Sequence, residues 1–447
     1  MKVALIGGGG SRTPLLYHGL LQRAHNLPGI ELVLHDTSDR WLRRVRKVLR
    51  GIEEERSDRV PTATTTDLDD ALDGADFVLT AIRVGGFDAR RWDEDVPHAH
   101  GVVGQETVGP GGFGLALRNV PALQTIAAAM HRRCPRAWLV NLTNPAGMAT
   151  EALRAQLGDR VVGVCDSPTA LTRRVARALG LPPGAAHFDY GGINHLGWLT
   201  GVWHHGHDLL PGFLASEQVA TIEEVRLVGV ERVRAVGAIP NEYLYFYERT
   251  NDARANVSRN NSRGAFLAGR RRALADAIDG APTSTDALNA YAAHLKQRQD
   301  TYMTVESGLR RAPTADVFTD ASGYHEMALS VIEAIACDRP TVLIVNTGNR
   351  GALRFLPDDA VVEVPAVVRT AGVFALASHV PASQQRLVER VKTFDAATLR
   401  AIELGSRGAA LEALAGHPLV GSRDVAAAIM TGYAEHVPAV RALLGTR

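Results

Sequence analysis

The stretch VALIGGGGS at residues 3–11 largely decides the fold of this chain. Val3 to Ile6 form a short apolar run that fits a buried strand, and four glycines follow it directly. Residues 14–24 then carry apolar side chains at helical spacing. A strand that passes through glycines into a helix is the opening unit of a dinucleotide-binding sheet, although a tight turn alone would also explain the glycines.

Short apolar runs and helix-like segments alternate from this stretch to residue 165. Helical spacing returns at residues 37–54 and 114–132. Further strand-like runs occupy residues 31–35, 75–82, 137–142 and 160–165. Such alternation is typical of α/β proteins, so it predicts a Rossmann-type, doubly wound parallel sheet.

The alternation ends near residue 165, and we place a domain boundary there. Residues 1–165 are predicted to form a Rossmann-like NAD-binding domain. Residues 166–447 mix helices with strands such as 360–364, so we expect a larger α+β domain there. The Ala- and Leu-rich residues 396–444 are predicted to be helical.

The composition argues against several classes of protein. The chain has 447 residues with 49 Lys and Arg against 48 Asp and Glu, and this net charge of +1 argues against a nucleic acid partner. No apolar run reaches the ~18 residues of a membrane span, so we expect no membrane partner. Cys134, Cys165 and Cys337 are too few for a disulfide scaffold, which favours a reducing, cytoplasmic location.

The glycine-rich turn is the predicted site for a cofactor pyrophosphate. Glycine lets the backbone approach the phosphates, and the helix that follows offers free N–H groups. Arg12 stands where the dinucleotide-binding motif has its third glycine. The predicted cofactor contacts in this turn are Gly7, Gly8, Gly9, Gly10, Ser11 and Arg12.

Asp36, at the end of the second predicted strand, favours NAD as the cofactor. An acidic side chain there accepts hydrogen bonds from ribose hydroxyls, whereas NADP needs a cation for its additional phosphate. Arg12 and Arg40 leave this second possibility open. Arg83, which follows the third predicted strand, is a further candidate to face the anionic cofactor.

Cys165 and His195 lie in glycine-containing segments at or near the ends of predicted strands. A thiolate and an imidazole are both suitable ligands for a transition metal. For each residue taken alone, however, a structural role in the core is the stronger explanation. Two ligands in separate segments do not by themselves make a metal-binding motif.

Eight motifs occur in order over essentially the full length of the chain. They are IGGGGSRTP (6–14), RVGGFDAR (83–90), GVVGQETVGPGGF (101–113), NLTNPAGM (141–148), GVCDSP (163–168), GINHLGW (192–198), IPNEYLYFY (239–247) and LPDDAVVEVPAVV (356–368). With these motifs the chain resembles glycoside hydrolase family 4, the NAD- and metal-dependent glycosidases, and within it the 6-phospho-β-glucosidases. The order of so many motifs is far more specific than any one of them.

The resemblance implies hydrolysis by a redox route instead of the usual pair of carboxylates. NAD⁺ takes a hydride from C3 of the sugar, and the resulting ketone acidifies the proton at C2. A base removes that proton, the aglycone leaves by elimination, water adds, and NADH returns the hydride. The expected substrate is a small phosphorylated sugar, namely a 6-phospho-β-glucoside.

The resemblance also implies roles for individual residues. Cys165 and His195 would hold a divalent metal, expected to be Mn²⁺. Tyr243 matches the catalytic base of the family, although its YLYFY segment alone would indicate an aromatic core. Glu106 matches an acidic residue near that tyrosine. Because tyrosine has a pKa of ~10, it needs a nearby positive charge to act as a base near neutrality.

Three further residues match substrate-binding positions of the family. Arg90 and Asn144 are expected to contact the sugar. Arg263 is expected to bind its phosphate, since a guanidinium donates two parallel hydrogen bonds to a phosphate. Arg254 and Arg259 lie in the same polar segment and are alternatives for this role.

Asp166 departs from the β-type pattern. The β-acting enzymes usually have asparagine after the cysteine, whereas α-acting phosphoglucosidases tend to have an aspartate that protonates the leaving oxygen. The RVGG and GVVGQETVGPGGF motifs are β-type. We therefore predict a 6-phospho-β-glucosidase first and keep a 6-phospho-α-glucosidase as the alternative.

Two other functions are compatible with a nucleotide-binding fold. An NAD-dependent 2-hydroxyacid dehydrogenase would need a His–Asp pair and an arginine for the substrate carboxylate, and it would accumulate NADH. A non-catalytic NAD-binding protein would turn over no glycoside. The resemblance also leads us to expect that the domain of residues 166–447 binds substrate and metal and contributes to oligomerisation. The expected assembly is a homodimer or homotetramer.

Overall fold

The computed structural model describes residues 1–56, 59–258, 262–309, 317–318 and 323–444. These residues form thirteen strands, which join in one sheet. The strands are β1 (Lys2–Ile6), β2 (Glu31–His35), β3 (Thr62–Thr65), β4 (Phe77–Thr80), β5 (Trp138–Asn141), β6 (Val161–Gly163), β7 (His187–Ile193), β8 (Leu196–His204), β9 (His207–Asp208), β10 (Ile239–Pro240), β11 (Thr341–Gly348), β12 (Val361–Arg369) and β13 (Gly372–Ala375).

The N-terminal half of the sheet is parallel, with the strand order β3-β2-β1-β4-β5-β6. Its register places Ile6 beside both His35 and Thr80, so the strands end at one common edge. The strand order reverses between β1 and β4. In sheets of this type, ligands bind outside the carboxyl ends of the strands at such a reversal.

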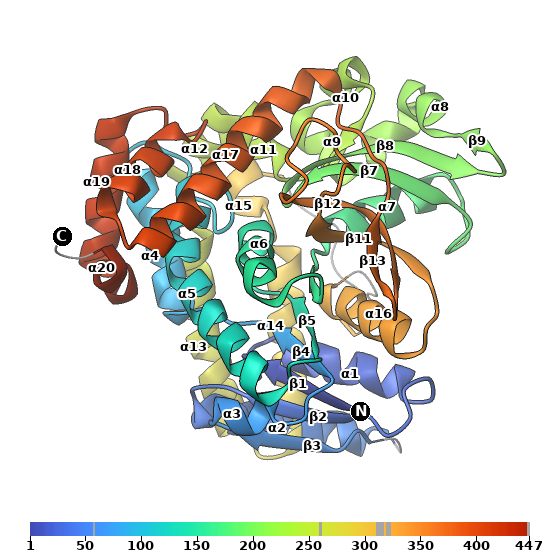
Figure 1. Cartoon of the computed structure of the whole chain (residues 1–447), viewed down its shortest axis with the longest axis vertical. Helices are drawn as coiled ribbons and strands as arrows, with labels where there is room; N and C mark the ends of the chain where they lie inside the picture. The colour runs from blue at the N-terminus through green and yellow to red at the C-terminus, as the bar shows by residue number, and fades with distance from the viewer. Residues whose placement is uncertain (57–58, 259–261, 310–316, 319–322, 445–447) are drawn as a thin grey trace.

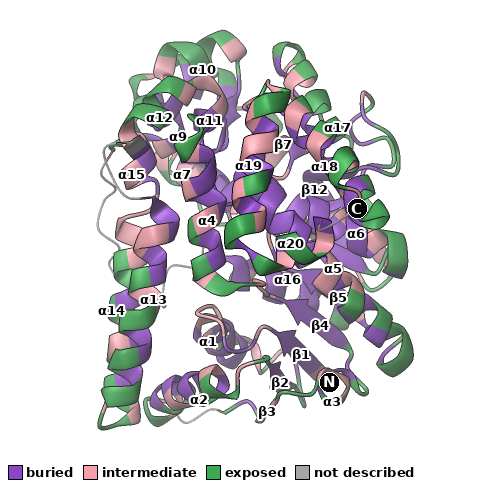
Figure 2. Cartoon of the chain, turned by 90° about the vertical axis from the view of Figure 1, so that its left-hand side faces the viewer, coloured by how far each residue is buried: buried purple, intermediate pink, exposed green. Residues whose placement is uncertain are grey.

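Helices cover both faces of the parallel strands. The helices of this half are α1 (Thr13–Arg23), α2 (Asp39–Glu54), α3 (Leu68–Leu72), α4 (Gly86–Ala99), α5 (Gly109–Arg133), α6 (Ala146–Leu157) and α7 (Ser167–Ala178). Val3 and Leu5 belong to an apolar cluster with α1 and α2, whereas Ala4 and Ile6 belong to one with α3, α5 and α6. Both faces of β1 are therefore apolar, and Figure 2 shows β1 and β4 as buried.

The second half of the sheet is antiparallel and continues directly from the first. β11 pairs with β6, and β12, β7, β8 and β10 follow in that order. Asn346 of β11 lies opposite Gly163, and Glu363 of β12 lies opposite Gly192. In Figure 1, the parallel strands lie below, and β7 and β8 lie at the upper right.

Helices from the second half pack against the first. Their bounds are α8 (Leu210–Ala215), the 3₁₀ helix η1 (Glu217–Thr221), α9 (Glu223–Val228), α10 (Val230–Val236), α11 (Leu244–Glu248), α12 (Thr250–Ser258), α13 (Arg263–Gly280), α14 (Ser284–Asp300), α15 (Thr304–Ser307), α16 (Tyr324–Ala336), α17 (Ala382–Leu404), α18 (Arg407–Gly416), α19 (Arg423–His436) and α20 (Pro438–Leu444). α14 packs on α2, α13 packs on α4, and α17 packs on α5 and α6. Helices that are distant in the sequence therefore form part of the surroundings of the N-terminal half.

The predicted Rossmann-type sheet followed by an α+β part is confirmed. β3 was not predicted, because its sequence TATT has no apolar run. The expected helical stretch at 396–444 begins earlier, at Ala382, and is divided into α17, α18, α19 and α20. The division at residue 165 stays a prediction, and it falls between β6 and α7 of a continuous sheet.

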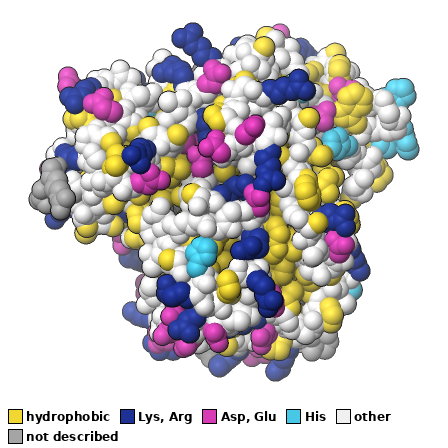
Figure 3. All heavy atoms as spheres, in the orientation of Figure 1, with side chains coloured by type: hydrophobic (Ala, Val, Ile, Leu, Met, Phe, Trp, Pro, Cys, Tyr) yellow, Lys and Arg dark blue, Asp and Glu magenta, His cyan; other side chains and the backbone are white. Residues whose placement is uncertain are grey.

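The surface carries charges of both signs. On the face in Figure 3, Lys and Arg side chains lie among Asp and Glu side chains. This mixture agrees with the net charge of +1. Among the described helices, none combines the length and the apolar character that crossing a membrane requires.

Candidate active site

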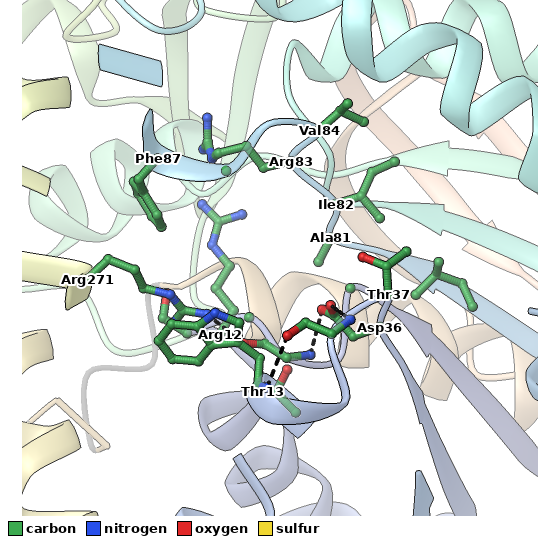
Figure 4. Close-up of a pocket in the computed structure, with 18 of the residues that line it drawn as sticks. Arg12, Thr13, Asp36, Thr37, Ala81, Ile82, Arg83, Val84, Phe87 and Arg271 are labelled. Carbon is green, nitrogen blue, oxygen red and sulfur yellow. Dashed lines mark hydrogen bonds between the residues drawn. The ribbon is translucent and has the colours of Figure 1, made fainter. Parts of the chain in front are cut away.

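A pocket of about 1040 Å³ lies at the carboxyl ends of the parallel strands. Its walls include the segments that follow β1, β2, β4 and β5. Figure 4 shows Arg83 and Phe87 across the pocket from Asp36. Arg271 and Arg298 reach the pocket from α13 and α14. The strand-end position predicted for the nucleotide is therefore a real concavity, closed by helices from the other half of the chain.

Two glycines of the turn after β1 are required by close packing. Gly7 has a φ of +98°, and a Cβ there would lie 2.5 Å from the Ala81 carbonyl oxygen. A Cβ on Gly8 would lie 2.8 Å from the Leu34 Cβ. Because either contact would displace backbone or core atoms, these glycines let the turn lie close to β2 and β4. The residues of this turn that line the pocket are Gly7, Gly9, Gly10, Ser11 and Arg12.

Asp36 is fixed at the rim of this turn by backbone donors. The Gly9 N–H donates to Asp36 Oδ2 (3.0 Å), and the Ser38 N–H donates to Asp36 Oδ1 (3.0 Å). Arg40, which could have faced an additional phosphate, donates to Asp279 Oδ2 (2.9 Å). The positive charge of Arg40 is thus already paired with Asp279, while Asp36 lines the pocket. This arrangement favours a ribose hydroxyl over an additional phosphate at this position.

Arg271 completes this end of the pocket and was not predicted. Its guanidinium lies 3.2 Å from the centroid of the Trp41 ring, and its Nη2 donates to the Gly9 carbonyl (2.8 Å). Burial lowers the pKa of Arg271 to about 10. The residue lies in an arginine run of α13 that carries no nucleotide-binding motif, so only the fold brings it to the glycine turn.

Glu106 lies buried between the two predicted arginines, Arg83 and Arg90. Arg83 Nη2 donates to Glu106 Oε1, and Arg90 Nη1 lies 2.5 Å from Glu106 Oε2. Burial disfavours the charged form, but the two guanidinium groups outweigh it and hold the pKa of Glu106 well below its usual range. Arg90 also donates to Glu94 Oε1 (3.0 Å). This side of the site is therefore a buried ion-pair network.

Asn144 follows β5 and lines the same pocket. Its backbone carbonyl accepts a hydrogen bond from Asn119 Nδ2 (2.8 Å). Its side-chain Oδ1 is buried and has no hydrogen-bond partner among the described residues. Because a buried amide oxygen without a partner is costly, this atom is available to a ligand.

Tyr243 and His195 lie against each other in the interior. Their rings stack with centroids 3.8 Å apart and an interplanar angle of 19°. His195 has a φ of +64°, and both of its ring nitrogens are buried without a partner in the described part of the chain. Cys165 is buried and lies 3.9 Å from the Tyr324 hydroxyl. Gly163, two residues before Cys165, lies opposite Asn346, and both Asn346 and Asn194, the neighbour of His195, donate to Glu363, so the segments that carry the three predicted residues lie close together.

The chemistry of Cys165 and His195 fits a divalent metal. Burial lowers the pKa of His195 to about 3, so its ring is neutral, as a metal ligand must be. Burial also raises the pKa of Cys165 well above its usual value, and a bound cation would favour the thiolate. Within the described ranges, no group of three His, Cys, Asp or Glu side chains could hold a metal. Two ligands would leave other positions open to oxygen atoms of a substrate or water, as in catalytic metal sites.

Tyr243 belongs to a hydrogen-bonded group of its own. Its hydroxyl lies 2.8 Å from the Tyr302 hydroxyl, which also donates to Glu242 Oε1 (3.3 Å). Ser167 Oγ donates to the same Glu242 oxygen (2.7 Å). Burial raises the pKa of Tyr243 well above its usual value. Tyr302 lies outside every motif of the sequence, and its contact with Tyr243 appears only in the fold.

Asp166 caps α7 beside the turn after β1. Burial raises the pKa of Asp166, and the positive charge of Arg12 acts against this rise. Arg12 in turn lies 3.8 Å from the centroid of the Tyr324 ring. A carboxyl group with a raised pKa is suited to donate a proton.

Arg298, near the end of α14, was also missed by sequence reasoning. Its Nη1 donates to Ser11 Oγ (3.3 Å). Burial lowers the pKa of Arg298 to about 9, and the like charges of Arg12 and Arg90 lower it further. A concentration of positive charge in a low-dielectric site favours an anionic ligand. The surrounding sequence KQRQD gives no motif for this residue.

Arg263 holds the end of α14 in place. Its Nη1 donates to the Thr301 carbonyl (2.8 Å), and its Nη2 donates to the Arg298 carbonyl (2.7 Å). Arg263 therefore supports the end of α14, which carries Arg298. Most of the N–H donors of its guanidinium are already hydrogen-bonded. Of the two alternatives, Arg254 lies in α12 near Gly101, and Arg259 lies outside the described residues.

Two family models match consecutive parts of the chain. The model described as family 4 glycosyl hydrolase matches residues 2–181. The model described as family 4 glycosyl hydrolase C-terminal domain matches residues 190–420. Together they extend over most of the chain and include both predicted metal ligands.

The similar proteins are phosphoglucosidases. A probable 6-phospho-β-glucosidase of Bacillus subtilis is 31% identical, covering 96% of this chain and 95% of its own. The 6-phospho-β-glucosidase of Thermotoga maritima, solved with manganese, NAD⁺ and glucose-6-phosphate, has a TM-score of 0.82 at 26% identity, covering 97% of this chain and 98% of that one. A 6-phospho-α-glucosidase from gut microorganisms, solved with NAD and Mn²⁺, has a TM-score of 0.79 at 25% identity, covering 97% of each chain.

Proposed function

Because the chain belongs to family 4 of the glycosyl hydrolases, we propose that it hydrolyses 6-phospho-β-glucosides with the help of NAD and a divalent metal. The observation that carries this proposal is that the segment of Cys165 lies close to the stacked rings of His195 and Tyr243, where both His195 ring nitrogens lack a hydrogen-bond partner among the described residues. A 2-hydroxyacid dehydrogenase would instead need a His–Asp pair and an arginine for the substrate carboxylate. The solved 6-phospho-β-glucosidase with manganese and NAD⁺ supports the same cofactors here.

NAD is proposed to occupy the pocket at the glycine turn, with its ribose at Asp36 and its phosphates near Gly9 and Gly10. When bound, NAD⁺ accepts a hydride from C3 of the sugar and returns it, while a divalent metal at Cys165 and His195, proposed to be Mn²⁺, polarises the oxygens at C2 and C3. The side chains of the chain itself then have to orient the sugar, move its protons and exclude water.

Tyr243 is proposed to remove the proton from C2. Burial raises its pKa, and the positive charge of a metal beside it would act in the opposite direction. Asp166 is proposed to give a proton to the leaving oxygen, because its raised pKa keeps the carboxyl protonated to higher pH. Glu106 stays ionised and keeps Arg83 and Arg90 in place.

The sugar phosphate is proposed to bind at the cluster of arginines around the turn. Arg12 and Arg298 gather positive charge there, and Arg263 supports Arg298 through its carbonyl. Arg90 and Asn144 are proposed to contact the sugar. Asn144 Oδ1, which has no hydrogen-bond partner among the described residues, suits a hydroxyl donor.

A second candidate is the hydrolysis of 6-phospho-α-glucosides, and Asp166 is the observation that favours it. The residue lies directly after Cys165 with a raised pKa, as expected for an acid that protonates an α-linked leaving group. One of the similar solved structures is a 6-phospho-α-glucosidase. The β-type motifs keep the β-anomer as our first proposal.

A panel of four p-nitrophenyl glucosides separates these possibilities. The α- and β-anomers, each with and without the 6-phosphate, are incubated with the enzyme, NAD⁺, Mn²⁺ and a thiol reductant. We expect release of p-nitrophenol from the phosphorylated β-anomer at the highest kcat/KM. Higher kcat/KM for the phosphorylated α-anomer would establish the second candidate, and inactivity on both phosphorylated anomers would contradict both.

The assembly and the location are further parts of the proposal. We propose a homodimer or homotetramer, which light scattering of the purified chain measures directly. We also propose a reducing, cytoplasmic location, because the three described cysteines are free and Cys165 must remain a thiol to bind a metal. We expect that oxidation of Cys165 abolishes metal binding and that a thiol reductant restores it.

A further inference from the structure

Glu363 is a fully buried carboxylate in the middle of the sheet. It lies in β12, opposite Asn346 of β11 on one side and opposite Gly192 of β7 on the other. This is the place where the antiparallel strands join those that continue into the parallel half. A buried carboxylate is costly unless hydrogen bonds satisfy it, so the partners of Glu363 indicate why it is there.

Three side chains donate to this carboxylate from three different segments. Asn194 Nδ2 and Asn346 Nδ2 donate to Oε1, at 3.0 Å and 2.9 Å. The Tyr190 hydroxyl donates to Oε2 at 3.3 Å. Both oxygens are therefore in use, and one side chain links β11, β7 and the turn between β7 and β8.

The first partner leads to His195. Asn194 directly precedes His195, whose φ of +64° is unusual for a residue other than glycine. Such a backbone conformation persists when surrounding contacts hold it. The hydrogen bond from Asn194 to Glu363 holds the backbone next to His195 and so fixes the turn between β7 and β8.

The second partner leads to Tyr243. Asn241 Nδ2 donates to the Tyr190 hydroxyl (3.2 Å), and the Tyr243 N–H donates to Asn241 Oδ1 (3.1 Å). Tyr190 and Asn241 are both fully buried. Because Tyr243 stacks on His195, the first and second paths from Glu363 meet at the pair of rings.

The third partner leads toward Cys165. Asn346 lies opposite Gly163 in the sheet, two residues before Cys165. A Cβ on Gly163 would lie 2.9 Å from the Asn346 Cβ, so the two residues are in close contact. Asn346 thus helps to fix the end of β6, which leads to Cys165.

We infer that Glu363 is a positioning residue that fixes Cys165, His195 and Tyr243 relative to one another. Among the described residues no hydrogen bond joins it to any of the three, and it acts through Asn346, Asn194 and the pair Tyr190–Asn241. Burial raises the pKa of the Cys165 thiol, and the negative charge of Glu363 raises it further. The inference rests on the proposed metal site at Cys165 and His195. Partners behind metal ligands are known to set ligand orientation, and their loss typically weakens metal affinity by about 10- to 100-fold.

The test compares Mn²⁺ affinity, measured from the electron paramagnetic resonance of free Mn²⁺, with NAD⁺ affinity in the same variants. For Glu363→Ala we expect a loss of Mn²⁺ affinity of about tenfold or more, with NAD⁺ affinity within about twofold of the wild type. Glu363→Gln keeps an oxygen for the two asparagines and should recover most of the Mn²⁺ affinity. Thermal unfolding of each variant shows that the fold is retained.

Glu224→Ala is the matched control, because Glu224 is also a fully buried glutamate but pairs with Arg174. It should lower the unfolding temperature and leave Mn²⁺ affinity unchanged. If Glu363→Ala does not fold, two single variants carry the test. Asn194→Ala should weaken Mn²⁺ binding, whereas Tyr190→Phe should lower kcat at saturating Mn²⁺ while Mn²⁺ affinity stays within about threefold.

The outcomes separate this inference from the proposed function. A wild-type chain that binds no Mn²⁺ would contradict the metal site itself. A wild-type chain that binds Mn²⁺, together with a folded Glu363→Ala or Asn194→Ala variant of unchanged Mn²⁺ affinity, would overturn the positioning role alone.

Discussion

Asp166 and Glu106 are two carboxylates of one site with opposite tendencies. Burial raises the pKa of Asp166, whereas Arg83 and Arg90 hold the pKa of Glu106 well below its usual range despite burial. Carboxylates whose pKa values are pushed apart in this way commonly divide acid and electrostatic roles between them. Asp166 is accordingly the candidate proton donor, and Glu106 keeps the arginines in place.

Asp166→Asn should therefore affect substrates according to their leaving groups. An alkyl 6-phosphoglucoside needs a proton on its leaving oxygen, so kcat should fall about 100-fold or more, while the p-nitrophenyl compound should lose about tenfold at most. In the wild type, the alkyl activity should decline as pH rises through the raised pKa of Asp166, because only the protonated acid donates. This alkaline decline should be absent from the variant, and equal losses on both substrates would contradict the role.

Cys165→Ser tests the metal ligand directly. A serine hydroxyl is a far weaker acid than a thiol and does not readily supply an anionic ligand, so the variant should hold Mn²⁺ poorly and lose about 100-fold or more of its metal-dependent kcat. NAD⁺ binding, measured by protein fluorescence, should stay as in the wild type, because the glycine turn is untouched. Full activity in Cys165→Ser would remove this residue from the metal site.

Arg12→Ala tests the anion site at the turn after β1. A hydrogen bond to a charged group contributes roughly 1.5–3 kcal/mol, so kcat/KM for the 6-phosphorylated substrate should fall about 10- to 100-fold. The unphosphorylated substrate should change little. The affinity for NAD⁺ serves as a control, because Arg12 also lines the cofactor pocket. Equal losses on both substrates would exclude a role in binding the sugar phosphate.

At the scale of the elements, β6 depends on a glycine next to the metal site. A Cβ on Gly163 would lie 2.1 Å from Thr150 Oγ1 and 2.9 Å from the Asn346 Cβ. The lack of a side chain there lets α6 and β11 pack closely against the strand that leads to Cys165.

Gly163→Ala should consequently destabilise the protein by about 1–3 kcal/mol and weaken Mn²⁺ binding, since overpacking forces the neighbouring elements apart. Gly269→Ala is the control, because nothing lies within 4 Å of a Cβ at that position of α13 and the change favours the helix. Urea unfolding of the two variants gives the comparison. A Gly163→Ala variant as stable as Gly269→Ala would show that β6 tolerates the methyl group.

The elements also show how far the sequence leads. The strands β1, β2, β4, β5 and β6 were predictable because each is an apolar run next to a turn or helix signal. Their carboxyl ends then predicted the cofactor pocket around Asp36 and Arg83. β3 was not predictable, since an edge strand with the sequence TATT has no apolar pattern. The burial of Arg90 in α4 was also missed, because an arginine next to Arg91 resembles a solvated face until its carboxylate partners are placed.

The whole molecule supplies what local patterns lack. Arg271 and Arg298 reach the turn after β1 from helices that begin more than 250 residues later, at Arg263 and Ser284. Tyr302, just beyond the end of α14, reaches Tyr243 from 59 residues later in the chain. No local motif marks these residues, because their role arises only when α13 and α14 fold back over the parallel strands.

The continuity of the sheet explains why Cys165 and His195 can act together. Cys165 follows the last parallel strand, and His195 lies in a hairpin of the antiparallel half. β11 and β12 join the two halves and place Asn346 and Glu363 at the junction between them. The proposed metal site therefore lies at the junction of the two halves, where the sequence alone offered only two separate residues.

The dependence of hydrolysis on NAD⁺ tests the redox mechanism most directly. The enzyme is stripped of nucleotide, and p-nitrophenol release from p-nitrophenyl 6-phospho-β-glucoside is followed with Mn²⁺ present, before and after NAD⁺ is added back, together with the absorbance of NADH. We expect release only after NAD⁺ is added, with many turnovers per NAD⁺ and no net accumulation of NADH. Equal release without NAD⁺, or one NADH formed for each p-nitrophenol released, would contradict hydrolysis by oxidation, elimination and return of the hydride.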